Sequence, residues 1–320
     1  MPLVDMSLSK LKEYEGCNPR PEDMDAFWDA AIMEMKSVDP CIELVPAVFS
    51  VPFAECFDLY FTGVRKARIH AKYIRPGKDT GQHSAVVQFH GYSSNSGDWF
   101  DKLNYVAAGF SVAVLECRGQ GGLSEDVGGI KGNTFRGHFI RGLDDSPENM
   151  LFRHIFLDAA QLASIVMDMP EVDGTRVAAM GHSQGGGLTL ACSALEPRIN
   201  RLAPSYPFLS DYKRVWEMDL LKDAYAELKD YFRMFDPRHI RENDIFTRLG
   251  YIDVQHLAGR IKGRVLMGVG LMDTVCPPST QFAAYNKITS QKDMYTYPDF
   301  GHDTLPGFGD AVYSFMMEMI

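Results

Sequence analysis

The sequence lacks any apolar run of the roughly 18 residues that a membrane span requires. Its 320 residues include 32 Lys and Arg against 42 Asp and Glu, for a formal net charge of −10. The basic surface that nucleic-acid binders need is therefore not expected. We predict a partner that is neither a membrane nor a nucleic acid. With 46% hydrophobic and 23% charged residues, the chain has the composition of a globular protein with a sizeable core.

The chain also lacks paired cysteines and metal-binding motifs. Its six cysteines are scattered with no C-x-x-C pair, and Cys117 and Cys192 lie in apolar runs, where cysteine acts as a small buried hydrophobic residue. None of the nine histidines has H-E-x-x-H or another metal-ligand spacing, so no metal site is expected. Residues 1–16 show neither the basic nor the apolar region of a secretory signal. These features favour reduced thiols in a cytoplasmic protein.

The first part of the chain changes from a helical to a strand pattern. After Pro21, which fits a first helical position, apolar residues recur at a 3/4 spacing: Met24, Phe27, Trp28, Ala31, Ile32 and Met35. Three runs with β-branched or aromatic residues follow between turn signals, at residues 47–51, 56–62 and 67–74. Consecutive strands joined by short turns predict an antiparallel start to a sheet.

From residue 84 onward, apolar runs alternate with helical segments such as residues 152–169. The runs are residues 84–90, 111–116, 176–180, 264–270 and 294–299, with a further strand near 201–206. Apolar strands separated by helices predict an α/β fold, with a mostly parallel central sheet and helices on both faces. In such a sheet, ligands bind beyond the carboxyl ends of the strands. Chemically active residues are therefore expected directly after these runs.

One segment interrupts the alternation, because the stretch between residues 206 and 264 is too long for a plain crossover. We predict a helical insertion (about 208–262) after the sixth strand, in a position to cover the site. Its aromatic residues either line a substrate pocket or belong to a core or interface: Tyr206, Phe208, Tyr212, Trp216, Tyr231 and Phe232. No linker or repeat is visible, so residues 1–320 are expected to form a single domain with an N-terminal helical extension (about 1–40).

The segment Gly181-His182-Ser183-Gln184-Gly185 lies between a predicted strand and a predicted helix. A G-x-S-x-G match alone is a weak signal. A strand, a sharp turn and a helix are, however, the setting of a nucleophile elbow, in which small flanking residues permit a strained turn that exposes the serine Oγ. We predict Ser183 as a nucleophile and the N–H of Gln184 as one oxyanion donor. A glycine-rich phosphate-type turn or a decayed site is the alternative.

An elbow serine needs an orienting acid and a basic histidine, which follow it in that chain order. Asp273 comes after one apolar strand and His302 after the last. A buried carboxylate would fix the imidazole tautomer and stabilise the imidazolium formed when Ser183 gives up its proton. Asp299 and Asp303 are rivals for the acid role, although Asp303 is adjacent to His302 in sequence, which makes a facing geometry awkward.

Two glycine-containing loops complete the predicted site. The loop after residues 84–89 should supply the second oxyanion donor. Tyr92 N–H is the candidate because Gly91 lets the backbone turn inward, while His90 is interpreted as a structural histidine below the site. The glycine-rich segment that starts at Arg118 could bind phosphate, but no G-x-G-x-x-G helix follows. A structural loop in which Arg118 pairs with a carboxylate and braces the site is favoured.

Three motifs coincide in the chain: Arg118-Gly119-Gln120, Gly181-His182-Ser183-Gln184-Gly185 and Gly301-His302-Asp303. Together they resemble the acetyl xylan esterase / cephalosporin C deacetylase family of carbohydrate esterases (family 7, in the α/β-hydrolase superfamily), which is marked by RGQ, GxSQG and His-Glu. The resemblance runs the full length, including residues 89–99, 206–212 and 270–280. G-x-S-x-G alone is generic, whereas its combination with RGQ at this distance is fairly specific.

The resemblance implies an α/β-hydrolase fold and a cofactor-free, cytoplasmic enzyme that assembles as a homohexamer with its sites facing an inner cavity. Carried over residue by residue, it implies a catalytic triad, an oxyanion hole of two backbone amides and two supporting side chains: Ser183, Asp273 and His302; Tyr92 and Gln184; Arg118 and Gln120. Asp303 stands where the family has Glu. Since that position is not a triad member, the change concerns local bracing rather than activity.

The expected activity is that of a serine carboxylesterase that deacetylates small O-acetylated substrates through an acetyl-enzyme. Acetylated xylo-oligosaccharides and cephalosporin C are the expected substrates. Two alternatives stay open. One is another serine hydrolase on the same scaffold, such as a peptidase or a longer-chain esterase, because a fold does not fix a function. The other is a scaffold that keeps the fold without turnover.

Overall fold

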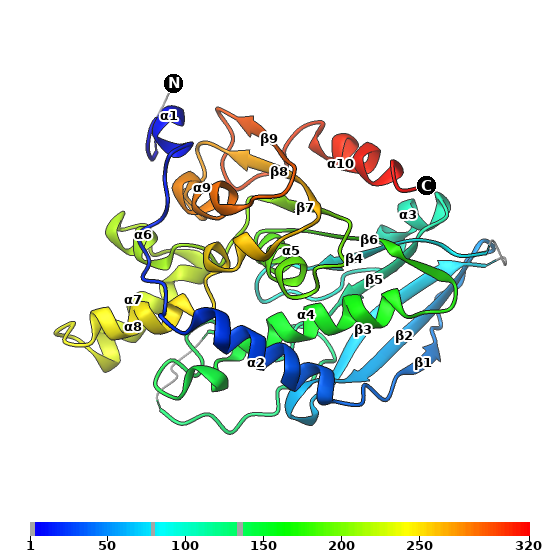
Figure 1. The fold of residues 1–320 in the computed structure, drawn as a ribbon, viewed down its shortest axis with the longest axis horizontal. Coiled ribbons are helices and arrows are strands. Elements are labelled where there is room, and N and C mark those ends of the chain that lie inside the picture. The colour runs from blue at the N-terminus through cyan, green and yellow to red at the C-terminus, as the bar shows by residue number, and fades with distance from the viewer. Residues whose placement is uncertain (1–3, 78–80, 133–136) are drawn as a thin grey trace.

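The computed structural model describes residues 4–77, 81–132 and 137–320, and its centre is a mixed sheet (Figure 1). The described strands form a nine-stranded sheet in the order β1-β2-β3-β5-β4-β6-β7-β8-β9. Their bounds are β1 Glu43–Pro46, β2 Ala54–Thr62, β3 Arg68–Pro76, β4 His83–Phe89, β5 Ser111–Leu115, β6 Val172–His182, β7 Arg201–Ser205, β8 Arg264–Gly270 and β9 Lys292–Tyr297.

The sheet has an antiparallel part and a parallel part. β1, β2 and β3 pair antiparallel, and β3 joins β5 antiparallel. From β5 through β4, β6, β7 and β8 to β9, every neighbouring pair is parallel. Every residue of β5 is buried, as expected for a strand covered on both faces. The predicted mostly parallel sheet with an antiparallel start is confirmed.

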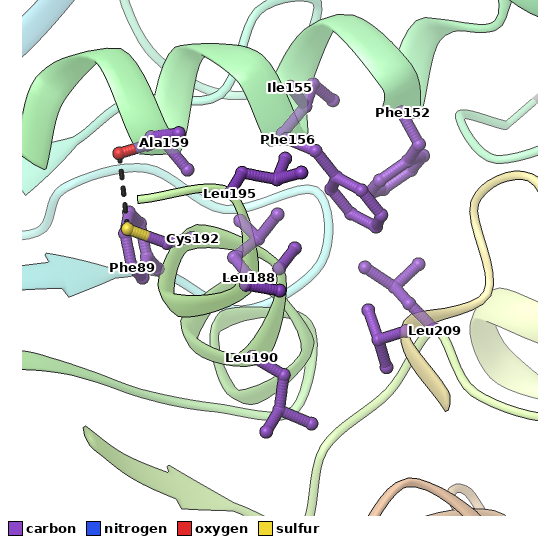
Figure 2. Close-up of a cluster of buried hydrophobic side chains, with 14 of the residues drawn as sticks. Phe89, Phe152, Ile155, Phe156, Ala159, Leu188, Leu190, Cys192, Leu195 and Leu209 are labelled. Carbon is purple, nitrogen blue, oxygen red and sulfur yellow. Dashed lines mark hydrogen bonds between the residues drawn. The ribbon is translucent and has the colours of Figure 1, made fainter. Parts of the chain in front are cut away.

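Helices cover both faces of this sheet. One buried apolar cluster includes side chains of α2 (Met24–Ser37), α4 (Leu151–Met167), α5 (Gln184–Leu195) and α9 (Pro278–Lys287). The other includes side chains of α3 (Leu103–Ala107) and α10 (Phe308–Met317). Figure 2 shows the first cluster where Phe152 and Phe156 of α4 approach Leu188 of α5. There the Cys192 thiol donates to the Ala159 carbonyl at 3.4 Å.

The N-terminal segment contains α1 (Leu8–Leu11) and the helix predicted from the 3/4 spacing, α2. The predicted apolar stripe is the buried face of α2: Met24, Phe27, Trp28, Ala31 and Met35. Trp28 stacks on Phe156 of α4 with ring centroids 5.8 Å apart. The stripe therefore fastens the N-terminal extension to the main body.

The prediction of a strand at residues 47–51 is wrong. β1 lies earlier, at Glu43–Pro46, and Val51 forms an isolated bridge with Ala54 instead of a ladder. Val48, in the middle of the predicted run, is fully exposed. Ala47 and Phe49 pack, partly buried, against the second apolar cluster, but the run pairs with no neighbouring strand of the described residues over its length.

The segment between β7 and β8 is helical, as predicted. Its elements are α6 (Tyr212–Glu217), α7 (Ala226–Phe235) and α8 (Glu242–Gly250), with 3₁₀ turns at Asp223–Tyr225, Val254–His256 and Ala258–Arg260. It follows β7, the seventh strand in chain order, and not the sixth as expected. Phe208, Tyr212, Tyr231 and Phe232 belong to the buried core, while Tyr206 and Trp216 are partly buried. No helix in the described residues is long and apolar enough to cross a membrane.

Candidate active site

Ser183 lies at the sharp turn between β6 and α5, and the predicted strand, turn and helix are all present. Its backbone has φ 55° and ψ −121°, a region that few non-glycine residues occupy. The Ser183 N–H donates to the Ser205 carbonyl at 3.0 Å, and its carbonyl accepts the N–H of Phe208 at 2.9 Å. The strained turn is thus held by the end of β7 and the segment that follows it.

Close backbone contacts explain the two glycines of the G-x-S-x-G segment. A Cβ on Gly181 would lie 2.6 Å from the carbonyl oxygen of Gly185. A Cβ on Gly185 would lie 2.1 Å from the carbonyl oxygen of Phe89, at the end of β4. Neither backbone oxygen can move aside as a flexible side chain could, so α5 starts this close to β4 because these positions carry no side chain.

The structure brings Ser183, His302 and Asp273 together from three segments at the carboxyl edge of the sheet. His302 Nε2 lies 3.0 Å from Ser183 Oγ, and His302 Nδ1 lies 2.8 Å from Asp273 Oδ2. Asp273 is 0% exposed. Its Oδ1 accepts the N–H groups of Val275 and Cys276, each at 2.8 Å. The carboxylate is therefore fixed by its own loop and holds the imidazole in one orientation.

The two rival carboxylates do not hold His302 in this arrangement. Asp299 is exposed, and Asp303 Oδ2 accepts the N–H of Gly301 at 3.1 Å, within its own loop. The Tyr206 ring packs edge-on against the imidazole, with centroids 4.7 Å apart. Burial and the nearby Asp273 raise the pKa of Tyr206, so its phenol stays neutral. No sequence pattern predicts this ring beside the histidine.

One group among the described residues has metal-ligand spacing: donor atoms of Asp273, Cys276 and His302 lie within 4.8 Å of one another. The carboxylate and the imidazole are hydrogen-bonded to each other. Burial raises the pKa of Cys276 well above its usual value, which disfavours the thiolate that a metal requires. This donor set fits a serine–histidine–acid arrangement better than a metal site.

The loop after β4 is held in place by the hydrogen bonds of His90. His90 Nδ1 donates to the Gly91 carbonyl at 2.7 Å, and His90 Nε2 accepts the Cys117 N–H at 3.0 Å. This pattern needs a neutral ring, and burial lowers the pKa of His90 accordingly. The structural interpretation of His90 therefore fits. Gln184 is the first residue of α5, so its N–H has no acceptor within the helix.

The side chain of Gln120 links the two segments that carry the predicted oxyanion donors. Its Nε2 donates to Gln184 Oε1 at 2.8 Å, and Gln184 Nε2 donates back to Gln120 Oε1 at 3.1 Å. The same Gln120 Oε1 accepts the N–H of Ser93, next to Tyr92, at 2.9 Å. The start of α5 and the loop after β4 are thus tied to each other through one amide.

Arg118 is buried and paired with a carboxylate, which is Asp158 on α4. Its Nε and Nη2 donate to the two oxygens of Asp158 at 2.6 and 2.5 Å. Both side chains are almost completely buried. Such a bidentate contact fixes the guanidinium plane, so Arg118 joins the loop after β5 to the helix layer beneath the site.

Sequence reasoning missed Glu227 of α7, whose carboxylate accepts the phenolic O–H of Tyr92. Glu227 and Tyr92 are 135 positions apart. The polar and apolar residues of α7 are spaced as in any amphipathic helix. No local sequence pattern therefore distinguishes Glu227 from a solvent-facing carboxylate.

Comparison with known proteins shows similarity to acetyl esterases along nearly the whole chain. The family model of acetyl xylan esterase (AXE1) matches residues 1–319. Acetyl esterase Axe7A of Xylanibacter ruminicola is 26% identical over 308 residues, which cover 94% of this chain and 67% of that protein.

Two solved structures are similar over nearly the full length. Acetyl xylan esterase 1 from Thermoanaerobacterium sp. JW/SL YS485 is 67% identical, with a TM-score of 0.97 and coverage of 98% of this chain and 99% of that chain. Acetyl xylan esterase from Paenibacillus sp. R4 is 32% identical, with a TM-score of 0.93 and coverage of 98% and 100%. With this similarity and this site, the chain belongs to the acetyl xylan esterase family and is a carboxylic ester hydrolase.

Proposed function

We propose that this protein is a serine acetyl esterase that removes acetyl groups from small O-acetylated carbohydrates, such as acetylated xylo-oligosaccharides, and from cephalosporin C. The observation that carries the proposal is the continuous hydrogen-bonded line from Ser183 Oγ through His302 to the buried Asp273 carboxylate. The cytoplasmic location and the homohexamer implied by the family resemblance stay part of this proposal. Sites that face an inner cavity would favour short oligosaccharides over polymeric xylan.

The geometry supports a two-step reaction. His302 Nε2 takes the proton of Ser183 as Oγ attacks the acetyl carbonyl carbon, and Asp273 stabilises the imidazolium. The bond to the sugar oxygen then breaks, and that oxygen leaves with the proton from His302. A water molecule, deprotonated by His302, attacks the acetyl-enzyme and releases acetate and free Ser183.

The backbone N–H groups of Tyr92 and Gln184 would stabilise the negative oxygen that develops in each step. Donors already aimed at this oxygen stabilise the transition state more than the bound ester, and losing one typically costs about 10²- to 10³-fold in rate. The Gln120 side chain supports both donors, because it contacts Gln184 and the N–H of Ser93.

Hydrolysis of aryl acetate, butyrate and octanoate by the unmodified protein and by Ser183→Ala tests the proposal. We expect acetate turnover that falls steeply with acyl length and drops by about 10⁴-fold or more in the variant. Ser193→Ala is the matched control. Its hydroxyl lies on the same helix but bonds to the Thr189 carbonyl, so its activity should stay near that of the unmodified protein.

A serine-reactive phosphonate should label Ser183 once per chain, and mass spectrometry of the labelled peptide identifies the site. A preference for octanoate would favour a longer-chain esterase. Activity that survives in Ser183→Ala would overturn the assignment of the nucleophile.

A further inference from the structure

The buried carboxylate of Glu227 has no part in the proposed mechanism, yet it joins three segments beside the site. Glu227 lies on α7 of the insertion and is 5% exposed. Its Oε1 accepts the phenolic O–H of Tyr92. Its Oε2 accepts the N–H groups of His138 and Phe139 at 2.9 and 3.1 Å. One carboxylate thus connects the insertion, the loop after β4 and residues 138–139.

The backbone next to Glu227 is shaped to admit this carboxylate. Gly137 has φ +100°, and a Cβ there would lie 1.9 Å from Glu227 Cδ. The Tyr92 phenol oxygen also accepts the N–H groups of His138 and Phe139, at 3.1 and 3.3 Å. Carboxylate and phenol therefore share two backbone donors in a compact network.

Tyr92 connects this network to the proposed oxyanion donor, because its own backbone N–H is that donor. Its ring packs against Phe152, Phe208 and His138, with centroids 6.3, 5.3 and 5.1 Å away. The next residue, Ser93, has φ 54°, and its Oγ lies 2.9 Å from His138 Nε2. A strained loop keeps its conformation only through contacts of this kind.

In this network both oxygens of Glu227 accept hydrogen bonds, as those of an ionised carboxylate do. The titratable groups that face it are Tyr92 and His138, with Tyr212 on α6 nearby. Burial raises the pKa of Glu227 to about 7, and the hydrogen bonds from Tyr92 and from backbone amides oppose that rise. Protonation would turn one acceptor oxygen into a donor and remove one of these bonds.

We propose that Glu227 is a positioning residue, whose ionised carboxylate holds the Tyr92 phenol and the His138 and Phe139 amides and so aims the Tyr92 N–H at the oxyanion. This inference rests on the proposed function. A small displacement of a donor weakens transition-state stabilisation more than substrate binding. Catalysis should therefore depend on the protonation state of Glu227 chiefly through kcat.

The test measures kcat and KM for an aryl acetate from pH 5 to pH 9 with the unmodified protein and Glu227→Gln. At pH 9 we expect about 10-fold lower kcat in the variant, with KM within about 2-fold. The ratio of kcat in the unmodified protein to kcat in the variant should fall toward 1 at pH 5. At that pH Glu227 in the unmodified protein is protonated and therefore uncharged, like the glutamine. Tyr92→Phe should lower kcat in the same pH-dependent way, and the double variant should lose no more than the single variants.

Asp253→Asn is the matched control. Asp253 is a fully buried carboxylate of the same insertion, and burial raises its pKa to about 7 as well. Its partners are the Asp211 N–H and Gln255 rather than the loop after β4. This change should lower stability while leaving a kcat ratio that does not vary with pH.

A pH-independent ratio for Glu227→Gln, or unchanged kcat at pH 9, would overturn the inference while leaving the proposed function intact. If Glu227→Gln does not fold, the pH dependence of kcat in Tyr92→Phe relative to the unmodified protein tests the inference instead. Failure of the unmodified protein to hydrolyse the acetate, or of Ser183 to take the phosphonate, would instead overturn the proposed function.

Discussion

At the scale of single residues, Gly185 illustrates how the absence of a side chain determines the site. We predict that Gly185→Ala destabilises the protein by more than about 3 kcal/mol, since the added Cβ would lie 2.1 Å from the Phe89 carbonyl oxygen. The matched control is Gly309→Ala. Gly309 lies in α10 with no atom within 4 Å of an added Cβ, so alanine should stabilise by about 0.5–1 kcal/mol.

Urea unfolding followed by circular dichroism measures both changes. If the two alanine variants shift the unfolding free energy equally, the close approach of α5 and β4 does not set the requirement for glycine.

The same scale shows which site residues a sequence reveals. Ser183, Asp273 and His302 could be selected because each follows a predicted strand, in the chain order that an elbow serine requires. Glu227 and the Asp158 partner of Arg118 could not be. Glu227 contacts Tyr92, 135 positions away, and Asp158 contacts Arg118, 40 positions away. Such pairings depend on how helices pack rather than on any local pattern.

At the scale of elements, the Arg118–Asp158 pair joins the loop after β5 to α4. We predict that Arg118→Met costs about 3–5 kcal/mol of unfolding free energy, because it leaves a fully buried carboxylate unpaired. Arg118→Met combined with Asp158→Leu should recover much of that loss. Thermal and urea unfolding of the single and double variants gives the comparison.

An exposed ion pair serves as the control. Arg20 and Asp25 are 42% and 64% exposed, and Arg20→Ala should cost less than about 1 kcal/mol. Equal losses in Arg118→Met and Arg20→Ala would contradict the structural role of the buried pair.

Elements were predictable where burial enforces a pattern. Residues 264–270 form β8 as predicted because the strand is covered by helices on both faces and its apolar run is continuous. Residues 47–51 fail because the edge of the sheet at β1 is exposed. There Ala47 and Phe49 are only partly buried, so composition and alternation alone do not decide the local structure.

At the scale of the whole molecule, buried titratable groups oppose one another in their effect on stability. Burial, together with Arg118, Arg65 and Arg153, lowers the pKa of His154 to about 3. Between that value and the unfolded value near 6.5, the unfolded chain binds the proton more readily, so stability falls as the pH falls. Glu227 and Asp253, whose pKa values are raised to about 7, act in the opposite direction over part of this range.

We predict that His154→Gln, which keeps a donor for the Glu148 carbonyl, removes the His154 part of this dependence. Relative to the unmodified protein, the variant should gain about 1.4 kcal/mol per pH unit on acidification from pH 6 to pH 4. Urea unfolding at pH 7.5, 6, 5 and 4 measures the difference. If the unfolding free energy of His154→Gln changed with pH in parallel with that of the unmodified protein, the prediction would be refuted.

The distance along the chain between the serine and the histidine has a consequence for refolding. Ser183 and His302 are 119 positions apart, and the segments that carry them meet only after β7, β8 and β9 have paired in parallel. Parallel pairings close long loops and form slowly compared with local helices. A chain with native helix content but with β9 not yet paired would give the circular-dichroism signal of a folded protein. It would have no esterase activity. The recovery of activity is therefore a more stringent measure of complete refolding than the recovery of helix content.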